Sequence, residues 1–237
     1  MQNNEGLYSI HKTGDELILL PKKGNKYKSV FIWLTGMDEK PENYLLTFNS
    51  FPPFFPHPET NKIIILCGEK RKITANKNCP YDLECYSWFD VYDFDNITET
   101  SINKEDLKKS EERIKKLIEE ETKYLGGYDN IYLGGFSQGA CMSIYIGCSF
   151  EHLLGGVICC SGLLYPGIKI NENNKKLNLF VSHGDADDQI SKKNNILSLK
   201  KINDFLNLEV HYYPNVGHYI EEKALANMVE FLYKIVK

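Results

Sequence analysis

The chain has 237 residues, of which 42% are hydrophobic and 12% aromatic, which excludes an intrinsically disordered chain and predicts one domain over residues 1–237. Its net charge of −4 offers no global positive field that would attract nucleic acid or an anionic membrane. Only two of its 28 basic residues are arginine, the residue best suited to bases and phosphates, so we expect no nucleic-acid partner.

Apolar runs of strand length alternate with helical patterns along the chain. In chain order, the sequence predicts strands at 16–20, 30–35 and 62–67, a helix at 103–125, a strand at 130–136, a helix at 138–148, strands at 155–162 and 177–184, a helix at 195–206, a strand at 209–214 and a helix at 222–236. This alternation is typical of an α/β fold with a mostly parallel central sheet and helices on both faces. Ligands bind such sheets beyond the carboxyl ends of the strands, so residues that follow strands are the candidates for a site.

Residues 48–58, FNSFPPFFPHP, are too rich in phenylalanine for a flexible linker and predict a packed surface loop. No stretch approaches the eighteen apolar residues of a membrane-spanning helix. The N-terminal residues also lack the pattern of a secretory signal. We therefore expect a soluble, cytoplasmic protein.

The cysteines predict buried, reduced thiols. They are Cys67, Cys79, Cys85, Cys141, Cys148, Cys159 and Cys160. Their number is odd and no two have C-x-x-C spacing, which argues against a disulfide framework and against a zinc site. We expect no metal and no cofactor.

Residues 135–139, GFSQG, match the G-x-S-x-G pattern of a nucleophilic serine. Such a serine lies on a tight turn between a strand and a helix, and the flanking glycines avoid clashes there. A strand is predicted before Ser137 and a helix after it, so the required context is present. The amides at the start of that helix would also face developing negative charge. Ser137 is the predicted nucleophile.

A serine hydroxyl needs a neighbouring base, and histidine suits this role near neutral pH. Of the six histidines, His218 follows the last predicted strand at the ligand-binding edge. His211 lies inside that strand, where a packing role is expected, and His183 is expected to support a turn. His218 is therefore the predicted general base.

An acid must orient the imidazole and stabilise its charged form. The segment HGDADD offers Asp185, Asp187 and Asp188 directly after a predicted strand. The order Ser, Asp, His along the chain is that of α/β hydrolases. Spacing alone leaves all three aspartates open. A second acidic cluster, Asp90, Asp93 and Asp95, predicts only a polar loop.

Four ordered blocks resemble the phospholipase/carboxylesterase family of α/β hydrolases, which includes the acyl-protein thioesterases. They are SWFD at 87–90, YLGGFSQGACMSIY at 132–145, HGDAD at 183–187 and VGH at 216–218. The resemblance runs from about residue 30 to the end of the chain. It implies the α/β-hydrolase fold, and its H-G-x-x-D pattern selects Asp187 as the acid of the triad.

Two segments differ from the family pattern. TGMDE, residues 35–39, stands where the family usually has H-G-L-G-D. The resemblance implies that the backbone N–H groups of Met37 and Gln138 form the oxyanion hole, and these donors do not depend on side-chain identity. The second difference is Asp188-Gln189-Ile190, where the family usually has a proline followed by apolar residues. We expect a different loop around Asp187.

The resemblance also implies an apolar channel for a long acyl chain beside the serine. Trp88 and Phe89 are predicted to line it, with a structural role as the alternative. The phenylalanines of 48–58 are further candidates, although aromatic residues beside prolines usually pack a loop.

The predicted reaction is hydrolysis of acyl thioesters or esters through an acyl-enzyme, with removal of palmitoyl groups from proteins as the leading version. The expected partners are S-acylated proteins, with lysolipids or small esters as the alternative, and the expected state is a monomer or weak homodimer with at most transient membrane association. A catalytically silent ligand-binding protein of the same fold is the alternative from another class.

Overall fold

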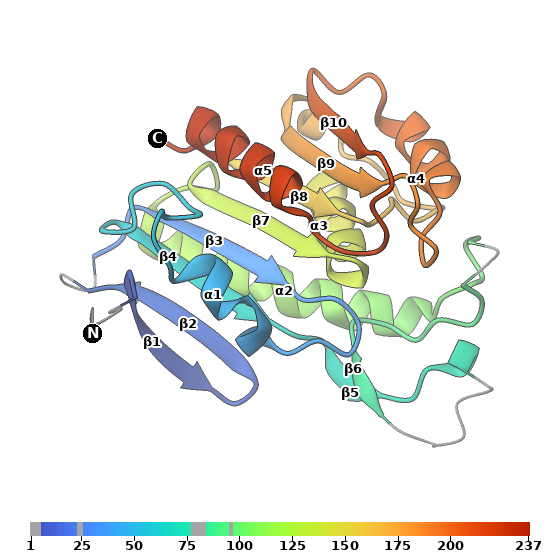
Figure 1. Cartoon of the computed structure of the whole chain (residues 1–237), viewed down its shortest axis with the longest axis horizontal. Helices are drawn as coiled ribbons and strands as arrows, with labels where there is room; N and C mark the ends of the chain where they lie inside the picture. Colours follow the sequence, from blue (N-terminus) through green and yellow to red (C-terminus); the bar gives the residue numbers. More distant parts are fainter. Residues whose placement is uncertain (1–5, 23–25, 77–83, 95–96) are drawn as a thin grey trace.

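The computed structural model describes residues 6–22, 26–76, 84–94 and 97–237. An eight-stranded sheet crosses the molecule in the order β1-β2-β4-β3-β7-β8-β9-β10 (Figure 1). Its strands are β1 (Tyr8–Thr13), β2 (Glu16–Pro21), β3 (Ser29–Leu34), β4 (Asn61–Leu66), β7 (Ile131–Phe136), β8 (Gly156–Cys160), β9 (Asn178–Gly184) and β10 (Asn207–Tyr213). A separate two-stranded sheet pairs β5 (Glu69–Arg71) with β6 (Cys85–Ser87).

The helices are α1 (Leu45–Phe48), α2 (Lys104–Leu125), α3 (Gln138–Ser149), α4 (Lys192–Leu199) and α5 (Glu222–Ile235). Short 3-10 turns are η1 (Pro41–Tyr44), η2 (Thr74–Asn76), η3 (Glu172–Lys176) and η4 (Lys200–Ile202). None of the helices among the described residues is long and apolar enough to span a bilayer.

The strands from β4 to β10 pair in parallel, whereas β2 pairs antiparallel with both β4 and the edge strand β1. The carboxyl ends of β3, β7, β9 and β10 therefore lie along one edge, where the loops that follow them meet. This agrees with the predicted mostly parallel sheet with helices on both faces.

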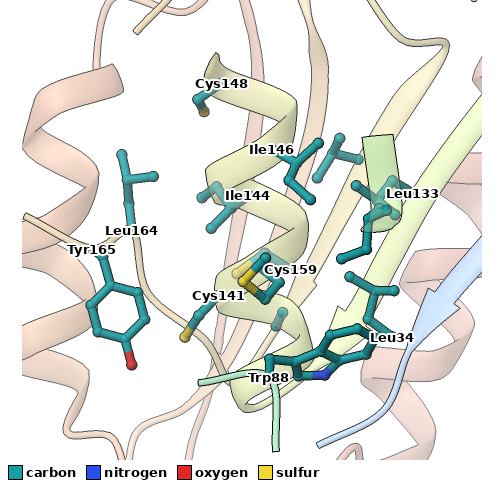
Figure 2. Packing of buried hydrophobic residues seen from close by; sticks show 14 of the residues in the cluster. Leu34, Trp88, Leu133, Cys141, Ile144, Ile146, Cys148, Cys159, Leu164 and Tyr165 are labelled. Atoms are coloured by element: carbon teal, nitrogen blue, oxygen red, sulfur yellow. The ribbon is translucent and has the colours of Figure 1, made fainter. Parts of the chain in front are cut away.

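Two apolar layers form the core, one on each side of the sheet. The strand period of two divides β3 between them, because Ile32 and Leu34 face one layer while Phe31 and Trp33 face the other. Helices α2 and α3 cover the first face, and α1 and α5 cover the second (Figure 1). Figure 2 shows part of the first layer, where side chains of α3 lie against Leu34 and Leu133 of the sheet.

Helix α1 and strands β1, β5 and β6 are not among the predicted elements, and one predicted helix has different bounds. Strand β1 was not predicted, because only Tyr8 of its six residues is buried and the others lack an apolar alternation. The helix predicted at 195–206 begins earlier and ends earlier. Ser191 caps α4 by accepting a hydrogen bond from the Asn194 amide, and the chain leaves the α-helix after Leu199. The predicted C-terminal end lies too far along the chain because buried apolar residues continue the helical pattern beyond Leu199.

The loop at 48–58 packs as predicted. Phe48, Phe54 and Phe55 are buried, and their ring centroids lie 5.2–5.8 Å from that of Phe31. Phe51, by contrast, is 84% exposed. The loop thus contributes to the second core layer.

The prediction of reduced thiols holds for the six described cysteines, which are all free, and five of them are buried. Cys85 is only half-buried. Cys79 lies outside the described residues.

Candidate active site

Ser137 lies on the tight turn between β7 and α3, with φ of 53° and ψ of −120°. Its amide is anchored to the carbonyl oxygen of Cys160 on the neighbouring strand, at 2.9 Å. The turn requires the two glycines that flank it. A Cβ on Gly139 would lie 2.1 Å from the carbonyl oxygen of Leu34, and a Cβ on Gly135 would lie 2.5 Å from the backbone of Gly139. The G-x-S-x-G pattern thus has its physical cause in backbone contact.

His218 connects the serine to an aspartate. Its Nε2 lies 2.8 Å from the Oγ of Ser137, and its Nδ1 lies 2.8 Å from Oδ2 of Asp187. An ionised carboxylate only accepts, so Nδ1 carries the hydrogen and Nε2 is left to accept the serine hydroxyl hydrogen. This is the tautomer that a general base needs. The structure therefore brings together the three residues that the sequence placed in the triad.

The two neighbouring aspartates lie elsewhere. Asp185 accepts a hydrogen bond of 2.7 Å from the amide of Asn215, and so joins the loop after β9 to the loop that carries His218. Asp188 contacts the side chain of Gln189. Of the three aspartates that spacing left open, Asp187 is the one bonded to His218.

Asp187 is fully shielded from solvent, with a side chain 0% exposed. Burial alone would raise its pKa, but the hydrogen bonds from His218 and from the amides of Ile190 and Gln189 outweigh it and hold the pKa below its usual value. The acid is therefore ionised at neutral pH. The unusual segment after Asp187 still supplies these amide donors.

His183 supports the same loop, as expected. Its Nε2 lies 2.7 Å from the carbonyl oxygen of Ile190 and 3.5 Å from Oδ2 of Asp187. The carbonyl can only accept, so Nε2 carries the hydrogen. Burial lowers the pKa of His183, which keeps the ring neutral beside the acid. His211 lies inside β10 and stacks on Phe180, consistent with a packing role.

The loop after β3 is held from several directions although Thr35 replaces the usual histidine. The carbonyl oxygen of Thr35 accepts a hydrogen bond of 2.9 Å from Nε1 of Trp88. The amide of Gly36 donates to Oε2 of Glu39 at 2.7 Å, and the hydroxyl of Tyr44 donates to the same oxygen at 2.6 Å. Glu39 thus positions this loop, a role that the sequence did not reveal. Nothing in the TGMDE pattern shows that the carboxylate of Glu39 folds back onto the loop that carries it.

Met37 and Gln138, the predicted oxyanion donors, lie beside Ser137 and His218 in the wall of one cavity. Within the described residues, neither backbone N–H is hydrogen-bonded to another group. Both amides therefore remain available to a ligand atom.

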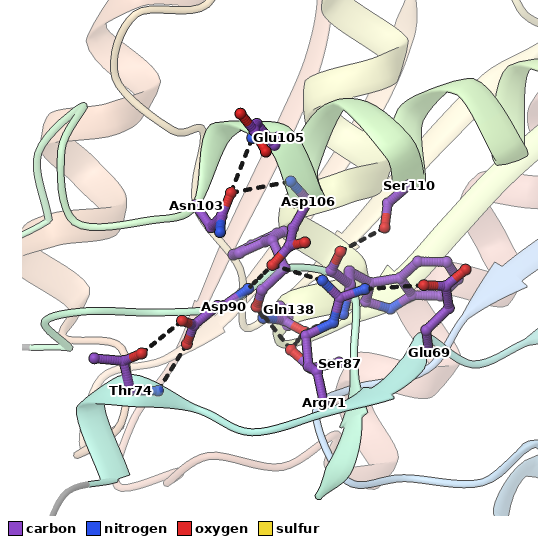
Figure 3. Close-up of polar contacts among 12 residues, drawn as sticks. Glu69, Arg71, Thr74, Ser87, Asp90, Asn103, Glu105, Asp106, Ser110 and Gln138 are labelled. Atoms are coloured by element: carbon purple, nitrogen blue, oxygen red, sulfur yellow. Dashed lines mark hydrogen bonds and ion pairs between the residues drawn. The ribbon is translucent and has the colours of Figure 1, made fainter.

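Both polar atoms of the Gln138 side chain bind the SWFD segment. Its Oε1 accepts from the amide of Trp88 at 2.8 Å and from the hydroxyl of Ser87 at 3.0 Å, and its Nε2 donates to the carbonyl oxygen of Phe89 at 2.8 Å. Figure 3 shows this contact and the polar groups that continue it towards α2. In that continuation, Asp106 accepts from the amide of Asp90 and from Arg71.

This arrangement corrects the role expected for Trp88 and Phe89. Both are 0% exposed, and neither belongs to the lining of the cavity beside the serine. Trp88 packs beside Leu34 in the core (Figure 2). Because their side chains are buried under the cavity wall, their structural alternative fits the geometry and direct substrate contact does not.

The cavity beside Ser137 has a volume of about 360 Å³. Its apolar wall is formed by Met37, Val91, Phe94, Ile102, Tyr165 and Ile190. Cys141 also faces it, next to Tyr165 (Figure 2). Burial raises the pKa of that thiol to about 12, so it is protonated at neutral pH and is a poor nucleophile.

A second cavity of about 310 Å³ adjoins the first. The two share Glu39, Phe136 and His218, whereas Ser137 lines only the first. The phenylalanines Phe48 and Phe54 contribute to this second cavity and not to the one beside the serine.

No metal-binding cluster occurs among the described residues. Asp90 accepts hydrogen bonds from the amide and hydroxyl of Thr74, as a loop-forming aspartate does. Asp95 lies outside the described residues.

Comparison with known proteins decides the family. The family model described as Phospholipase/Carboxylesterase matches residues 21–236. The chain belongs to the phospholipase/carboxylesterase family. It is 33% identical over 161 residues to acyl-protein thioesterase 1 of Debaryomyces hansenii, an alignment that covers 63% of this chain and 67% of the relative. It is 26% identical over 247 residues to acyl-protein thioesterase 1 of Mycosarcoma maydis, covering 96% and 98% of the two chains.

Solved structures of the same fold agree. Acyl-protein thioesterase 2 of Zea mays superposes with a TM-score of 0.76 at 21% identity, over 95% of this chain and 100% of that one. SOBER1 of Arabidopsis thaliana gives a TM-score of 0.74 at 20% identity, over 88% of this chain and 99% of that one. The predicted α/β-hydrolase fold is therefore confirmed. As a member of the phospholipase/carboxylesterase family, the protein is an esterase or thioesterase.

The close contact at Gly139 predicts a large loss of stability for Gly139→Ala. The new Cβ would meet backbone atoms of Leu34 and Thr35 that cannot rotate away, so we expect the free energy of unfolding to fall by about 2 to 3 kcal/mol. Urea denaturation measures it. Gly127→Ala is the matched control, since its Cβ would meet only the flexible end of Asp129, and a change within about 0.5 kcal/mol is expected. Equal stability of the two variants would contradict the argument.

Proposed function

We propose that the protein hydrolyses acyl thioesters of proteins, with Ser137 as nucleophile, His218 as general base and Asp187 as the orienting acid. The single observation that carries this proposal is the hydrogen-bonded chain Ser137–His218–Asp187, with both links at 2.8 Å, opening into an apolar cavity. The thioester preference is supported by relatives named acyl-protein thioesterase 1.

In the first half of the reaction, His218 Nε2 removes the hydroxyl proton as Oγ of Ser137 attacks the acyl carbonyl carbon. The imidazolium is stabilised by the ionised Asp187. The oxyanion would accept hydrogen bonds from the amides of Met37 and Gln138, and one such donor is typically worth about 3 kcal/mol of transition-state stabilisation. The carbon–sulfur bond then breaks, and His218 gives its proton to the departing thiolate.

In the second half, water attacks the acyl-enzyme. His218 takes one proton from the water, and the carbon–oxygen bond to Ser137 breaks as that proton passes to the serine. The products are a free acid and the regenerated enzyme. No redox or metal step is required by this sequence of bond changes.

The acyl chain belongs in the larger cavity. The acyl carbon is attached to Ser137, and Ser137 lines only that cavity. Its wall of apolar side chains can bury methylene groups, each worth roughly 0.8 kcal/mol when removed from water. This favours a medium or long acyl chain over acetyl.

A second candidate, hydrolysis of lysophospholipids or small carboxylic esters, is favoured by the family description Phospholipase/Carboxylesterase. It uses the same attack and the same acyl-enzyme, so the triad does not separate the two. The non-catalytic alternative is disfavoured by the tautomer and open amides described above.

Labelling with a fluorophosphonate probe tests the nucleophile. We expect stoichiometric labelling of the wild type and none of Ser137→Ala, because the probe needs an activated hydroxyl. Intact-protein mass spectrometry measures it. The neighbouring Ser161, which also has a positive φ of 50° after a strand, provides the matched control, and Ser161→Ala should keep its label. A folded wild type that stays unlabelled would favour the ligand-binding alternative.

The substrate class is then measured with an S-octanoyl peptide and a lysophospholipid of the same acyl length. We expect the higher kcat/KM for the peptide thioester. A clear preference for the lysolipid would replace the thioesterase proposal with the second candidate.

The three aspartates are separated by conservative substitution. Asp187→Asn should lower kcat by about 10⁴-fold, because an amide in place of the carboxylate supports the wrong histidine tautomer. Asp188→Asn is the matched control and should remain within about threefold of wild type, since among the described residues its carboxylate accepts a hydrogen bond only from the side chain of Gln189. Steady-state hydrolysis of a p-nitrophenyl ester measures both. Similar losses in the two variants would contradict the assignment of Asp187.

The role of Glu39 is tested through the loop after β3. Glu39→Ala frees the amide of Gly36, so we expect kcat to fall by about 10- to 100-fold with a smaller change in KM, somewhat less than the loss of an oxyanion donor itself. Tyr44→Phe removes only the hydroxyl bond to the same carboxylate and should cost less. Glu39→Gln, which keeps an acceptor oxygen, should restore part of kcat. A KM effect alone would show that Glu39 does not position the loop.

A further inference from the structure

The second cavity is a groove whose polar rim is acidic. Glu39, Glu221 and Glu222 line it, and no lysine or arginine does so among the described residues. None of the three carboxylates has a cationic nitrogen within 4.0 Å in the described part of the chain. Glu42, which lies close to Glu39 in sequence, is by contrast paired with Lys12. The groove therefore presents negative charge that the protein itself does not neutralise.

The local structure explains why each of the three carboxylates stands where it does in its own element. It does not explain why the three lie in the same groove. Glu221 and Glu222 lie at the start of α5, where the helix dipole favours negative charge. Glu39 comes from a different element and uses only Oε2 to hold its loop, which leaves Oε1 without a partner within the described residues. The groove brings these elements together beside His218.

The position of the groove assigns it to one half of the substrate. The departing group receives its proton from His218, and His218 lines both cavities, whereas the serine that keeps the acyl group lines only the first. On the basis of the proposed function, the second cavity is therefore the leaving-group side. We propose that this groove binds the positively charged peptide segment that flanks an S-acylated cysteine.

Charge complementarity favours a basic peptide over a phospholipid. A lysophospholipid would place its anionic phosphate between the ester and its headgroup, close to the three carboxylates. A lysine-rich segment has no such group, and its ammonium ions can meet the rim while its aliphatic stems lie over the apolar floor that includes Tyr44, Phe48 and Leu225.

The test uses S-octanoyl-cysteine peptides that differ only in their flanks, with two lysines or two glutamates on each side of the cysteine. For the wild type we expect kcat/KM for the lysine peptide to exceed that for the glutamate peptide by about tenfold at low salt. The ratio should shrink in 0.5 M NaCl, because the Debye length falls below about 10 Å.

The double variant Glu221→Gln/Glu222→Gln should reduce the ratio to about threefold or less, with each rate normalised to the turnover of a neutral S-octanoyl thioester by the same variant. Glu119→Gln/Glu120→Gln is the matched control. It removes the same charge from an adjacent, exposed pair on α2, across the sheet from the groove, and should leave the tenfold ratio intact.

Equal rates for the two peptides, with normal cleavage of the neutral thioester and normal labelling of Ser137, would overturn the groove assignment and leave the proposed function standing. An equal fall of the ratio in both double variants would also overturn it, because net charge alone would then explain the preference. Faster cleavage of lysophosphatidylcholine than of the lysine peptide would replace the peptide by a lipid headgroup. Loss of thioester cleavage altogether, with no labelling of Ser137, would instead refute the proposed function.

Discussion

The contact between Gly139 and the end of β3 is the constraint on which the site depends. A helix can begin this close to the carbonyl oxygens of Leu34 and Thr35 only where no Cβ intervenes. The contact places the first turn of α3 directly against the loop that follows β3. The serine and the two amides proposed to face an oxyanion therefore belong to elements in van der Waals contact, and their relative position does not depend on a flexible connection.

Buried hydrogen bonds extend this rigidity outward. Gln138 follows the serine, and both polar atoms of its side chain bind the SWFD segment. Trp88 of that segment in turn donates to the carbonyl oxygen of Thr35. A closed set of contacts thus joins α3, the SWFD segment and the loop after β3. Each of these polar groups is buried and paired, so removing one partner would leave another unsatisfied. Thr35 fits this arrangement through its backbone, which explains why a histidine is not required there.

The sequence predicted the parts of this architecture that depend on pattern. Strands buried on both faces appear as continuous apolar runs, and Ser137 and Asp187 follow two of them, whereas His218 follows the partly exposed edge strand β10. Strand β1 escaped prediction because an edge strand is partly solvated and its residues are mostly polar. Contacts between distant segments could not be predicted in this way. Trp88 and Phe89, for example, lie beneath the cavity wall. The sequence does not show this, because a distant segment that packs over a side chain decides whether that side chain faces a cavity or the core. Likewise, only the fold of its loop turns Glu39 back towards Gly36.

With the proposed assignment, the two cavities would recognise a substrate through different physical forces. The larger one offers apolar surface, whose contribution grows with buried area and depends little on salt. The groove offers charge, which acts over several ångströms and weakens with ionic strength. His218 lines both cavities. In the proposed reaction, the acyl chain would lie on one side of its ring and the departing group, which receives the proton, on the other. Selectivity for the acyl chain and selectivity for the sequence that carries it could therefore vary independently, because substitutions in one cavity wall need not change the other.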